Sequence, residues 1–180
     1  MYHVKINKII EKFNLENCTP DIDFEHITIS QTDVNRPALQ LAGFFDYFDS
    51  ERVQIIGKVE YTYLSKMDEE LRRQTLERLF SFKIPCLIMC RNLRPFPEMI
   101  TYANEYQVPI LLTEETTSEF MAELIRWLKV ELAPRITIHG VLVDIFGEGV
   151  LIMGESGVGK SEAALELIKR GHRLVADDVV

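Results

Sequence analysis

Residues 149–161 read GVLIMGESGVGKS, an apolar run followed by a glycine-rich loop that ends in lysine and serine. The loop has the form G-x-x-x-x-G-K-S, in which backbone N–H groups can curve around phosphate oxygens because glycine has no Cβ to obstruct them. The helix-like residues 162–170 follow, so the positive end of a helix dipole points at the same place. The pattern predicts a strand, a phosphate-binding loop and a helix.

The residue types in this loop predict a nucleoside triphosphate or another polyphosphate as the ligand. Lys160 supplies a cation for the β- and γ-phosphates, and the Ser161 hydroxyl can ligate Mg²⁺. The alternative is a glycine-rich turn that carries a lysine by coincidence, and the flanking strand and helix disfavour it. The predicted phosphate-binding residues are Gly154, Glu155, Ser156, Gly157, Val158, Gly159, Lys160 and Ser161.

The chain reaches this loop through a stretch rich in β-branched residues. Residues 135–153 predict a β-hairpin, with its turn at residues 147–149 and its second strand leading into the loop. The composition changes abruptly at Pro134, where we expect a domain boundary. The expected domains are residues 1–132 and residues 133–180.

Before this boundary, helical and strand-like patterns alternate. Apolar residues at helical spacing predict helices, and short apolar runs between turn residues predict strands. Such an order is typical of an α/β protein with a small, largely parallel sheet flanked by helices. The expected helices are residues 4–13, 39–43, 68–82, 98–106 and 117–132, and the expected strands are residues 52–57, 84–90 and 108–113.

The helix over residues 68–82 has an apolar face and a basic face. The basic face is expected to be solvated, and a phosphate-sensing patch is the alternative. The apolar face is expected to hold Leu71, Leu76, Leu79 and Phe80, and the basic residues are Arg72, Arg73 and Arg78.

The three cysteines are few and odd in number, which gives no disulfide framework. Cys86 and Cys90 lie four residues apart on an expected strand, so they share one face of it. Core packing is therefore favoured over a metal or redox pair.

Composition narrows the class of protein. The chain has 180 residues, of which 47% are hydrophobic, which is ample for a buried core. Its formal net charge is −8, which argues against a nucleic-acid backbone as the main partner. The sequence has neither an uninterrupted apolar span for a membrane nor the layout of a signal peptide, so a cytoplasmic location is expected.

Phosphoryl transfer also needs a metal and a group that orients or deprotonates the nucleophile. Residues 173–180 predict a strand that carries Asp177 and Asp178, of which only one should face the loop because neighbouring strand side chains point to opposite faces. An acidic pair that merely ends a strand is the alternative. His139 is expected within a strand, where a lone histidine is more often structural than catalytic. His172 is expected to cap the helix C-terminus.

Several stretches together carry a resemblance that spans almost the whole chain. They are HGVLVD at residues 139–144, GESGVGKSE at 154–162, LELIKRGHRLVADD at 165–178, NRPALQLAGFF at 35–45 and RVQIIG at 52–57. In these stretches the chain closely resembles the HPr kinase/phosphorylase family.

The resemblance implies a cytoplasmic bacterial enzyme that uses ATP and Mg²⁺ to phosphorylate a serine of the phosphocarrier protein HPr, and that regulates carbon catabolite repression. It also implies the reverse task, in which inorganic phosphate removes that phosphoryl group and pyrophosphate is released. By motif position, Asp178 is the catalytic carboxylate, His139 the catalytic histidine, and Lys160 neutralises charge in both directions.

The resemblance further implies a small N-terminal α/β domain and the start of a P-loop kinase domain similar to phosphoenolpyruvate carboxykinase. A magnesium-binding glutamate, a catalytic arginine and the helices that dock HPr and help to build a hexamer would lie beyond Val180. We therefore expect the kinase domain to be truncated and the chain to be inactive by itself.

Two other classes of function remain open from the residues alone. One is an ATP-binding regulatory module that transfers no phosphoryl group, and the other is a different P-loop kinase that acts on a small molecule. Use of phosphate with production of pyrophosphate would separate these from the favoured interpretation. The N-terminal domain shows no recognisable chemistry, and a structural or assembly role is expected for it.

Overall fold

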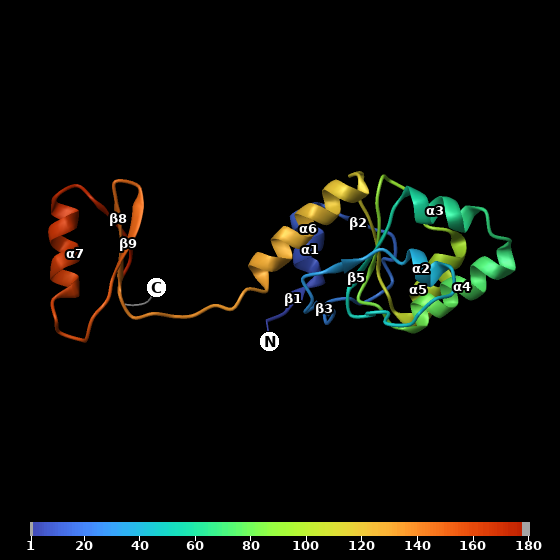
Figure 1. The fold of residues 1–180 in the computed structure, drawn as a ribbon, viewed down its shortest axis with the longest axis horizontal. Helices are drawn as coiled ribbons and strands as arrows, with labels where there is room; N and C mark the ends of the chain where they lie inside the picture. The colour runs from blue at the N-terminus through green and yellow to red at the C-terminus, as the bar shows by residue number, and fades with distance from the viewer. Residues whose placement is uncertain (1, 178–180) are drawn as a thin grey trace. The chain divides into compact units, whose positions relative to one another are not determined.

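The computed structural model describes residues 2–177, which form two compact units that divide between Ala133 and Pro134 (Figure 1). The predicted α/β class is confirmed. The helices are α1 (Ile6–Phe13), α2 (Ala38–Leu41), α3 (Lys58–Ser65), α4 (Glu69–Ser81), α5 (Pro97–Tyr106), α6 (Thr117–Glu131) and α7 (Lys160–Lys169). The strands are β1 (Val4–Lys5), β2 (Glu16–Asn17), β3 (Thr28–Ile29), β4 (Val34–Asn35), β5 (Val53–Ile56), β6 (Leu87–Met89), β7 (Ile110–Leu112), β8 (Val141–Ile145), β9 (Glu148–Ile152) and β10 (Arg173–Ala176).

The first unit is built on a five-stranded sheet with the order β2-β7-β6-β5-β4. Strands β4 to β7 are parallel to one another, and β2 is antiparallel at the edge. Every residue of β5, β6 and β7 is buried, as is typical of parallel strands that helices cover on both faces. The prediction of a largely parallel sheet is confirmed.

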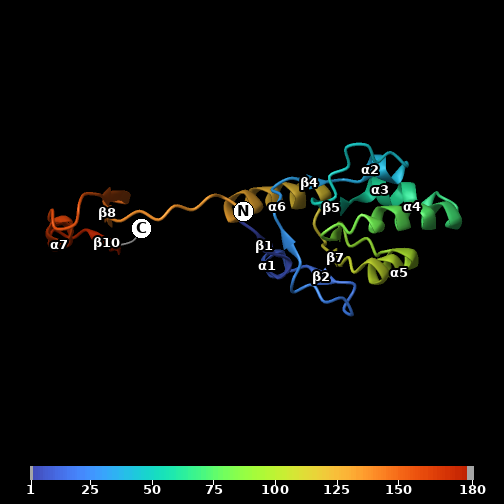
Figure 2. The ribbon, with the colours of Figure 1, turned by 90° about the horizontal axis from the view of Figure 1, so that it is seen from below.

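Helices cover the two faces of this sheet unequally (Figure 2). Helices α2 to α5 pack on one face, against Ile56, Leu87 and Met89. Helices α1 and α6 pack on the other face, against Ile55 and Ile88. Alternate strand residues thus enter alternate cores, because successive side chains of a strand point to opposite faces.

Cys86 and Cys90 both belong to the core under α1 and α6, and both are fully buried. The prediction that they pack in the core is confirmed. Burial raises the pKa of Cys86 to about 12 and that of Cys90 to about 11. Both thiols are therefore protonated at neutral pH.

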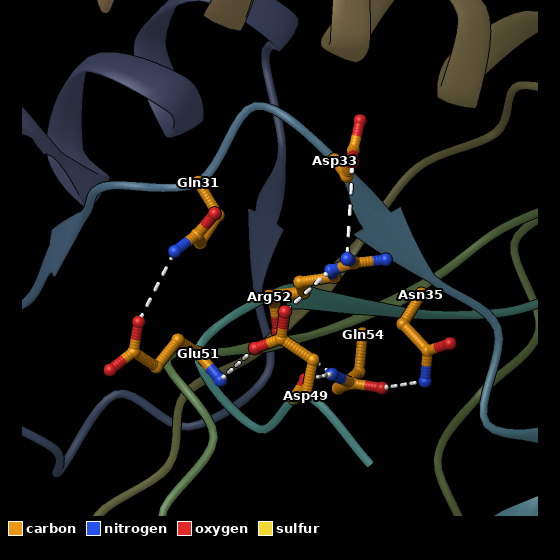
Figure 3. Close-up of polar contacts among 7 residues, drawn as sticks. All are labelled: Gln31, Asp33, Asn35, Asp49, Glu51, Arg52 and Gln54. Carbon is orange, nitrogen blue, oxygen red and sulfur yellow. Dashed lines mark hydrogen bonds and ion pairs between the residues drawn. The ribbon is translucent and has the colours of Figure 1, made fainter. Parts of the chain in front are cut away.

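A polar network joins β4 to β5 at the edge of the sheet (Figure 3). Gln54 is fully buried; its amide accepts a hydrogen bond from Asn35 Nδ2 at 2.7 Å and donates one to the carbonyl of Arg52 at 2.8 Å. The Arg52 guanidinium in turn contacts Asp49 at 2.8 Å and Asp33 at 3.9 Å. The two upstream stretches that carry the family resemblance therefore bond to each other as neighbouring strands.

The start of the chain differs from the prediction of a helix over residues 4–13. Val4 and Lys5 pair with β3 as an antiparallel strand, and the helix begins only at Ile6. The Ile6 N–H donates to the carbonyl of Ile27 at 3.1 Å. Pairing with this distant segment satisfies the backbone groups that a helix would otherwise have used.

Helix α4 corrects two predictions made for residues 68–82. Leu71 was expected on the buried face but is 48% exposed, whereas Leu76 and Leu79 are fully buried. Arg72 was expected on a solvated face, yet its side chain is only 17% exposed and pairs with Glu98 at 2.6 Å. The reason is that α5 packs beside α4, so position 72 faces the neighbouring helix.

The second unit is a three-stranded antiparallel sheet with the order β10-β8-β9 and α7 on one face. The predicted hairpin is confirmed for β8 and β9, but its two-residue turn lies at Phe146 and Gly147, with φ values of 53° and 88°, and not at residues 147–149 as predicted. Two positive φ values match the right-handed twist of the flanking strands. Residues 134–139, however, form no strand, so the prediction that His139 lies within one is wrong.

The end of the described chain also differs from the sequence-based prediction. Strand β10 stops at Ala176, so Asp177 follows the strand, and the predicted Asp178 lies outside the described residues. His172 contributes to the helix end through its backbone N–H, which donates to the carbonyl of Leu167 at 3.1 Å. The His172 ring packs edge-on against the Phe146 ring, with the two centroids 4.8 Å apart. The predicted cap is therefore made by the backbone of His172 and not by its side chain.

Within residues 2–177, no helix is both long enough and apolar enough to cross a membrane.

Candidate phosphate-binding site

Three glycines shape the loop between β9 and α7. Gly157 has a φ of 83° and Gly159 a φ of 98°, in the left-handed region where a side chain would be strained. Gly159 is also the residue that precedes α7. At Gly154 an added Cβ would lie 2.9 Å from Cγ1 of Val158, closer than carbon atoms can pack without a shift. The backbone path therefore requires glycine at positions 157 and 159, whereas at Gly154 only the exposed Val158 side chain would have to move.

Lys160, the first residue of α7, reaches back across the loop. Its Nζ donates hydrogen bonds to the carbonyl of Gly154 at 2.9 Å and to that of Glu155 at 2.8 Å. The ammonium is thus held over the loop by neutral acceptors, which an anion can replace with stronger charge-assisted bonds. The first-turn N–H groups of α7 have no acceptor within the helix and carry its positive dipole end. The geometry suits a phosphate group.

The predicted metal ligand Ser161 is exposed on the first turn of α7. Among residues 2–177, no three His, Cys, Asp or Glu side chains gather closely enough to hold a metal ion. Asp178, the predicted catalytic carboxylate, lies outside the part of the chain that the structure describes.

His139, just before β8, lies at the same end of the sheet as the loop. Val141 pairs with Ile152, so the residues before Val141 run beside those that enter the loop. Gly140 makes this approach close, because a Cβ there would lie 2.8 Å from the carbonyl oxygen of Ile152. His139 itself is exposed.

Asp177 lies at the same end of the sheet, after β10, which flanks β8 on the side opposite β9. Ala176 pairs with Leu142, and the chain leaves β10 in the direction of the start of β8. His139, the loop and Asp177 therefore lie at one end of the sheet, although they come from three separate segments. The sequence carries no signal for the roles of the Gly154 and Glu155 carbonyls, because every residue has a carbonyl.

Two family models match the sequence of this chain. The family model described as "HPr Serine kinase N terminus" matches residues 4–128, and the model described as "HPr Serine kinase C-terminal domain" matches residues 130–180. The chain belongs to the HPr serine kinase family. The resemblance inferred from the sequence motifs is thereby confirmed.

Curated relatives in the HPr serine kinase family match the full chain. A protein named HPr kinase/phosphorylase from Lachnoclostridium phytofermentans is 65% identical over 180 residues, which are 100% of this chain and 58% of that protein. One of the same name from Caldicellulosiruptor bescii is 54% identical with the same coverage. The chain thus spans 58% of the length of these relatives.

Among solved structures, the CBS and DRTGG domains of the regulatory region of Clostridium perfringens pyrophosphatase, complexed with the activator diadenosine tetraphosphate, are similar to this chain. The TM-score is 0.48 and the identity 18%, over 72% of this chain and 47% of that one. A likeness at this level supports no argument about function.

Proposed function

We propose that this HPr serine kinase chain contributes its phosphate-binding loop to an enzyme that transfers the γ-phosphoryl group of ATP to a serine of HPr. The proposal includes the reverse reaction, in which inorganic phosphate removes that group and pyrophosphate leaves. Its main support is the loop at residues 154–161, where Lys160 Nζ bridges the carbonyls of Gly154 and Glu155. A cytoplasmic location and a role in carbon catabolite repression belong to the same proposal.

The residues of the loop would bind and orient the reacting phosphates. When bound, ATP supplies the phosphoryl group, and Mg²⁺ neutralises part of its charge. Lys160 would exchange its two carbonyl acceptors for phosphate oxygens, and the N–H groups of Gly157, Gly159 and the first turn of α7 would donate to the same anion. The Ser161 hydroxyl would hold the metal ion.

Proton transfer is proposed for Asp178 in both directions. In the kinase reaction the serine oxygen would form a bond to the γ-phosphorus, the bond to the β-phosphate would break, and Asp178 would take the serine proton. In phosphorolysis a phosphate oxygen would attack, pyrophosphate would form, and Asp178 would return the proton to serine. His139 is proposed as a second catalytic residue because it lies two residues before Val141, whose pairing with Ile152 brings this segment beside the start of the loop.

The test uses the full-length protein with labelled ATP, Mg²⁺ and HPr, followed by a chase with inorganic phosphate. We expect a phosphoserine on HPr that disappears in the chase as an equal amount of pyrophosphate forms. The variant Asp178→Asn should lose both directions, while Asp144→Asn, at an acid already bonded to the Gly147 N–H, serves as the matched control.

Different results would favour the other candidates. If ATP binds but no label reaches HPr, the chain serves a nucleotide-binding regulatory module or another P-loop kinase. If label reaches HPr but phosphate releases none of it, the protein is a kinase without phosphorylase activity. Assembly of the full-length protein into a hexamer is part of the proposal, and sedimentation would test it separately.

A further inference from the structure

Gly140 is buried at the point where the chain bends into β8, directly after His139. A Cβ at this position would lie 2.8 Å from the carbonyl oxygen of Ile152 and 3.1 Å from Cδ1 of Leu151. The first of these contacts is with backbone, so no side chain can rotate away to relieve it. Any residue other than glycine would therefore force the two chain segments apart at this point.

The other two glycines of the hairpin have no such shortage of space. A Cβ at Gly149 would meet only Cδ1 of Leu142, at the ordinary van der Waals distance of 3.8 Å, and a Cβ at Gly147 would meet nothing within 4 Å. Gly147 has a positive φ, as its place in the turn requires, whereas Gly140 and Gly149 do not. At Gly140, therefore, it is the approach of β9 and not the backbone conformation that requires glycine.

The segment that would yield to a larger residue is the one before Gly140. Ile152 is the last residue of β9, which pairs with β8 along its whole length, and the ammonium of Lys160 ties together two carbonyls of the loop beyond it. Residues 134–139, in contrast, form neither helix nor strand. A side chain at position 140 would therefore displace His139, while the loop would keep its conformation.

We propose that Gly140 is a positioning residue, whose missing side chain sets the distance between His139 and the phosphate-binding loop. The inference rests on the proposed role of His139 in phosphoryl transfer. Gly140 presents no group to a substrate, so its effect on the reaction passes through His139. A displacement of about 1 Å in a catalytic group can cost about a hundredfold in rate, so the close approach at Ile152 matters more to transfer than to ATP binding.

The first test measures transfer of label from γ-labelled ATP to HPr by the full-length protein. Gly140→Ala should lower kcat by about tenfold to a hundredfold and leave the affinity for ATP, measured by titration, within about twofold. Gly149→Ala adds the same methyl group to the same hairpin where there is room, so it should leave both quantities within about twofold. Loss of ATP binding by Gly140→Ala, or an equal kcat in the two variants, would overturn the proposal.

The second test observes the imidazole of His139 without turnover. In protein with ¹³C-labelled histidine, the nuclear magnetic resonance signal of His139 is the one that is absent from His139→Gln. A non-hydrolysable ATP analogue should shift this signal in the unaltered protein and in Gly149→Ala, because the charge of the phosphates lies close to the ring. The shift should be smaller in Gly140→Ala. An equal shift in both glycine variants would mean that Gly140 does not set this distance.

A double variant separates this inference from the proposed function on which it rests. If Gly140 acts through His139, Gly140→Ala should lower kcat much less in a protein that already carries His139→Gln than in the unaltered protein. An equal loss in both would overturn the inference and leave the role of His139 standing. If His139→Gln by itself leaves kcat unchanged, the role proposed for His139 fails and this inference fails with it. Labelling of HPr by the unaltered protein tests phosphoryl transfer independently of both variants.

Discussion

At the scale of single residues, the site depends on where one ammonium group is held. Lys160 begins a helix and turns back over the loop, where two carbonyls hold it close to helix-terminal N–H groups. The three glycines permit this path, since two of them have positive φ and the third lies against Val158. Cation and backbone donors thus surround one small volume before any ligand binds, which is the arrangement that anion binding requires.

Changing Lys160→Gln should weaken ATP binding. The ammonium would be replaced by a neutral amide, and the loss of a charge-assisted bond should cost about 1.5–3 kcal/mol, or roughly tenfold to a hundredfold in affinity. Titration of full-length protein with ATP measures this change. Lys169→Gln, at the far end of α7, is the matched control and should bind as the unaltered protein does. Equal affinities in the two variants would contradict the role given to Lys160.

The loop was predictable from sequence because its glycines are needed for the conformation of their own backbone, which does not depend on distant residues. The contacts of Lys160 were not, since carbonyl acceptors leave no mark on the sequence. His139 was wrongly placed within a strand because the apolar residues Ile136 and Ile138 extend a strand-like pattern. Neither of them joins a strand, and Ile136 is 77% exposed.

At the scale of elements, the central strands of the parallel sheet can be predicted from short apolar segments, without knowledge of their partners. Strands β5, β6 and β7 were predicted because all of their residues except Gln54 are apolar. Strands β1 to β4 are only two residues long, and their existence depends on partners elsewhere in the chain, such as Ile29 for Val4. Helix α3 was missed as well; Val59, Tyr61, Thr62 and Tyr63 are residue types that are enriched in strands. Sequence patterns cannot reveal elements that distant pairing creates.

The polar link between β4 and β5 gives a prediction about stability. Gln54→Leu should lower the free energy of unfolding by about 1–3 kcal/mol, because it leaves the Asn35 amide and the Arg52 carbonyl without their partner. Urea unfolding would measure this. The double change Gln54→Leu with Asn35→Leu should recover part of the loss, since it also removes the Asn35 amide that the single change leaves unmatched. A double variant with the summed loss of the two single ones would contradict this account.

Cys86 and Cys90, the buried thiols that precede and follow β6 in the sequence, give a prediction about how stability depends on pH. The folded pKa of Cys86, about 12, lies above its ordinary value of 9.0, so the native state holds this proton more tightly than the unfolded state. The stabilisation is complete below pH 9.0, and it is lost progressively as the pH rises from there toward about 12. Urea unfolding at several alkaline pH values measures it, and Cys86→Ala should flatten the decline. A decline of the same steepness in Cys86→Ala would contradict this assignment.

At the scale of the whole molecule, the chain consists of two units, each with a core of its own. The prediction of a boundary at residue 132 rested on Pro134 and on the change to β-branched residues beyond it. Residues 134–139 join the units without helix or strand, and residues 134–137 are exposed. A change in composition along the sequence can indicate such a linker. It cannot indicate which residues pair across two helices, as Arg72 and Glu98 do.

Limited trypsin digestion should therefore cut first after Arg135, because that residue is exposed and lies outside regular structure. Mass spectrometry should find fragments ending at residue 135 and beginning at residue 136. Arg135→Gln should slow this cleavage and leave the rest of the pattern unchanged. A first cut within α4, which carries three arginines, would show that the N-terminal unit opens more easily than the linker.

The central claim is that the loop at residues 154–161 serves phosphoryl transfer to HPr. The most direct measurement incubates the full-length protein, carrying either Lys160→Gln or the control Lys169→Gln, with γ-labelled ATP, Mg²⁺ and HPr, and follows label on the HPr serine. The account predicts rapid labelling by the unaltered protein and by Lys169→Gln, and very little by Lys160→Gln. Equal labelling by both variants, or none by an unaltered protein that binds ATP, would contradict it.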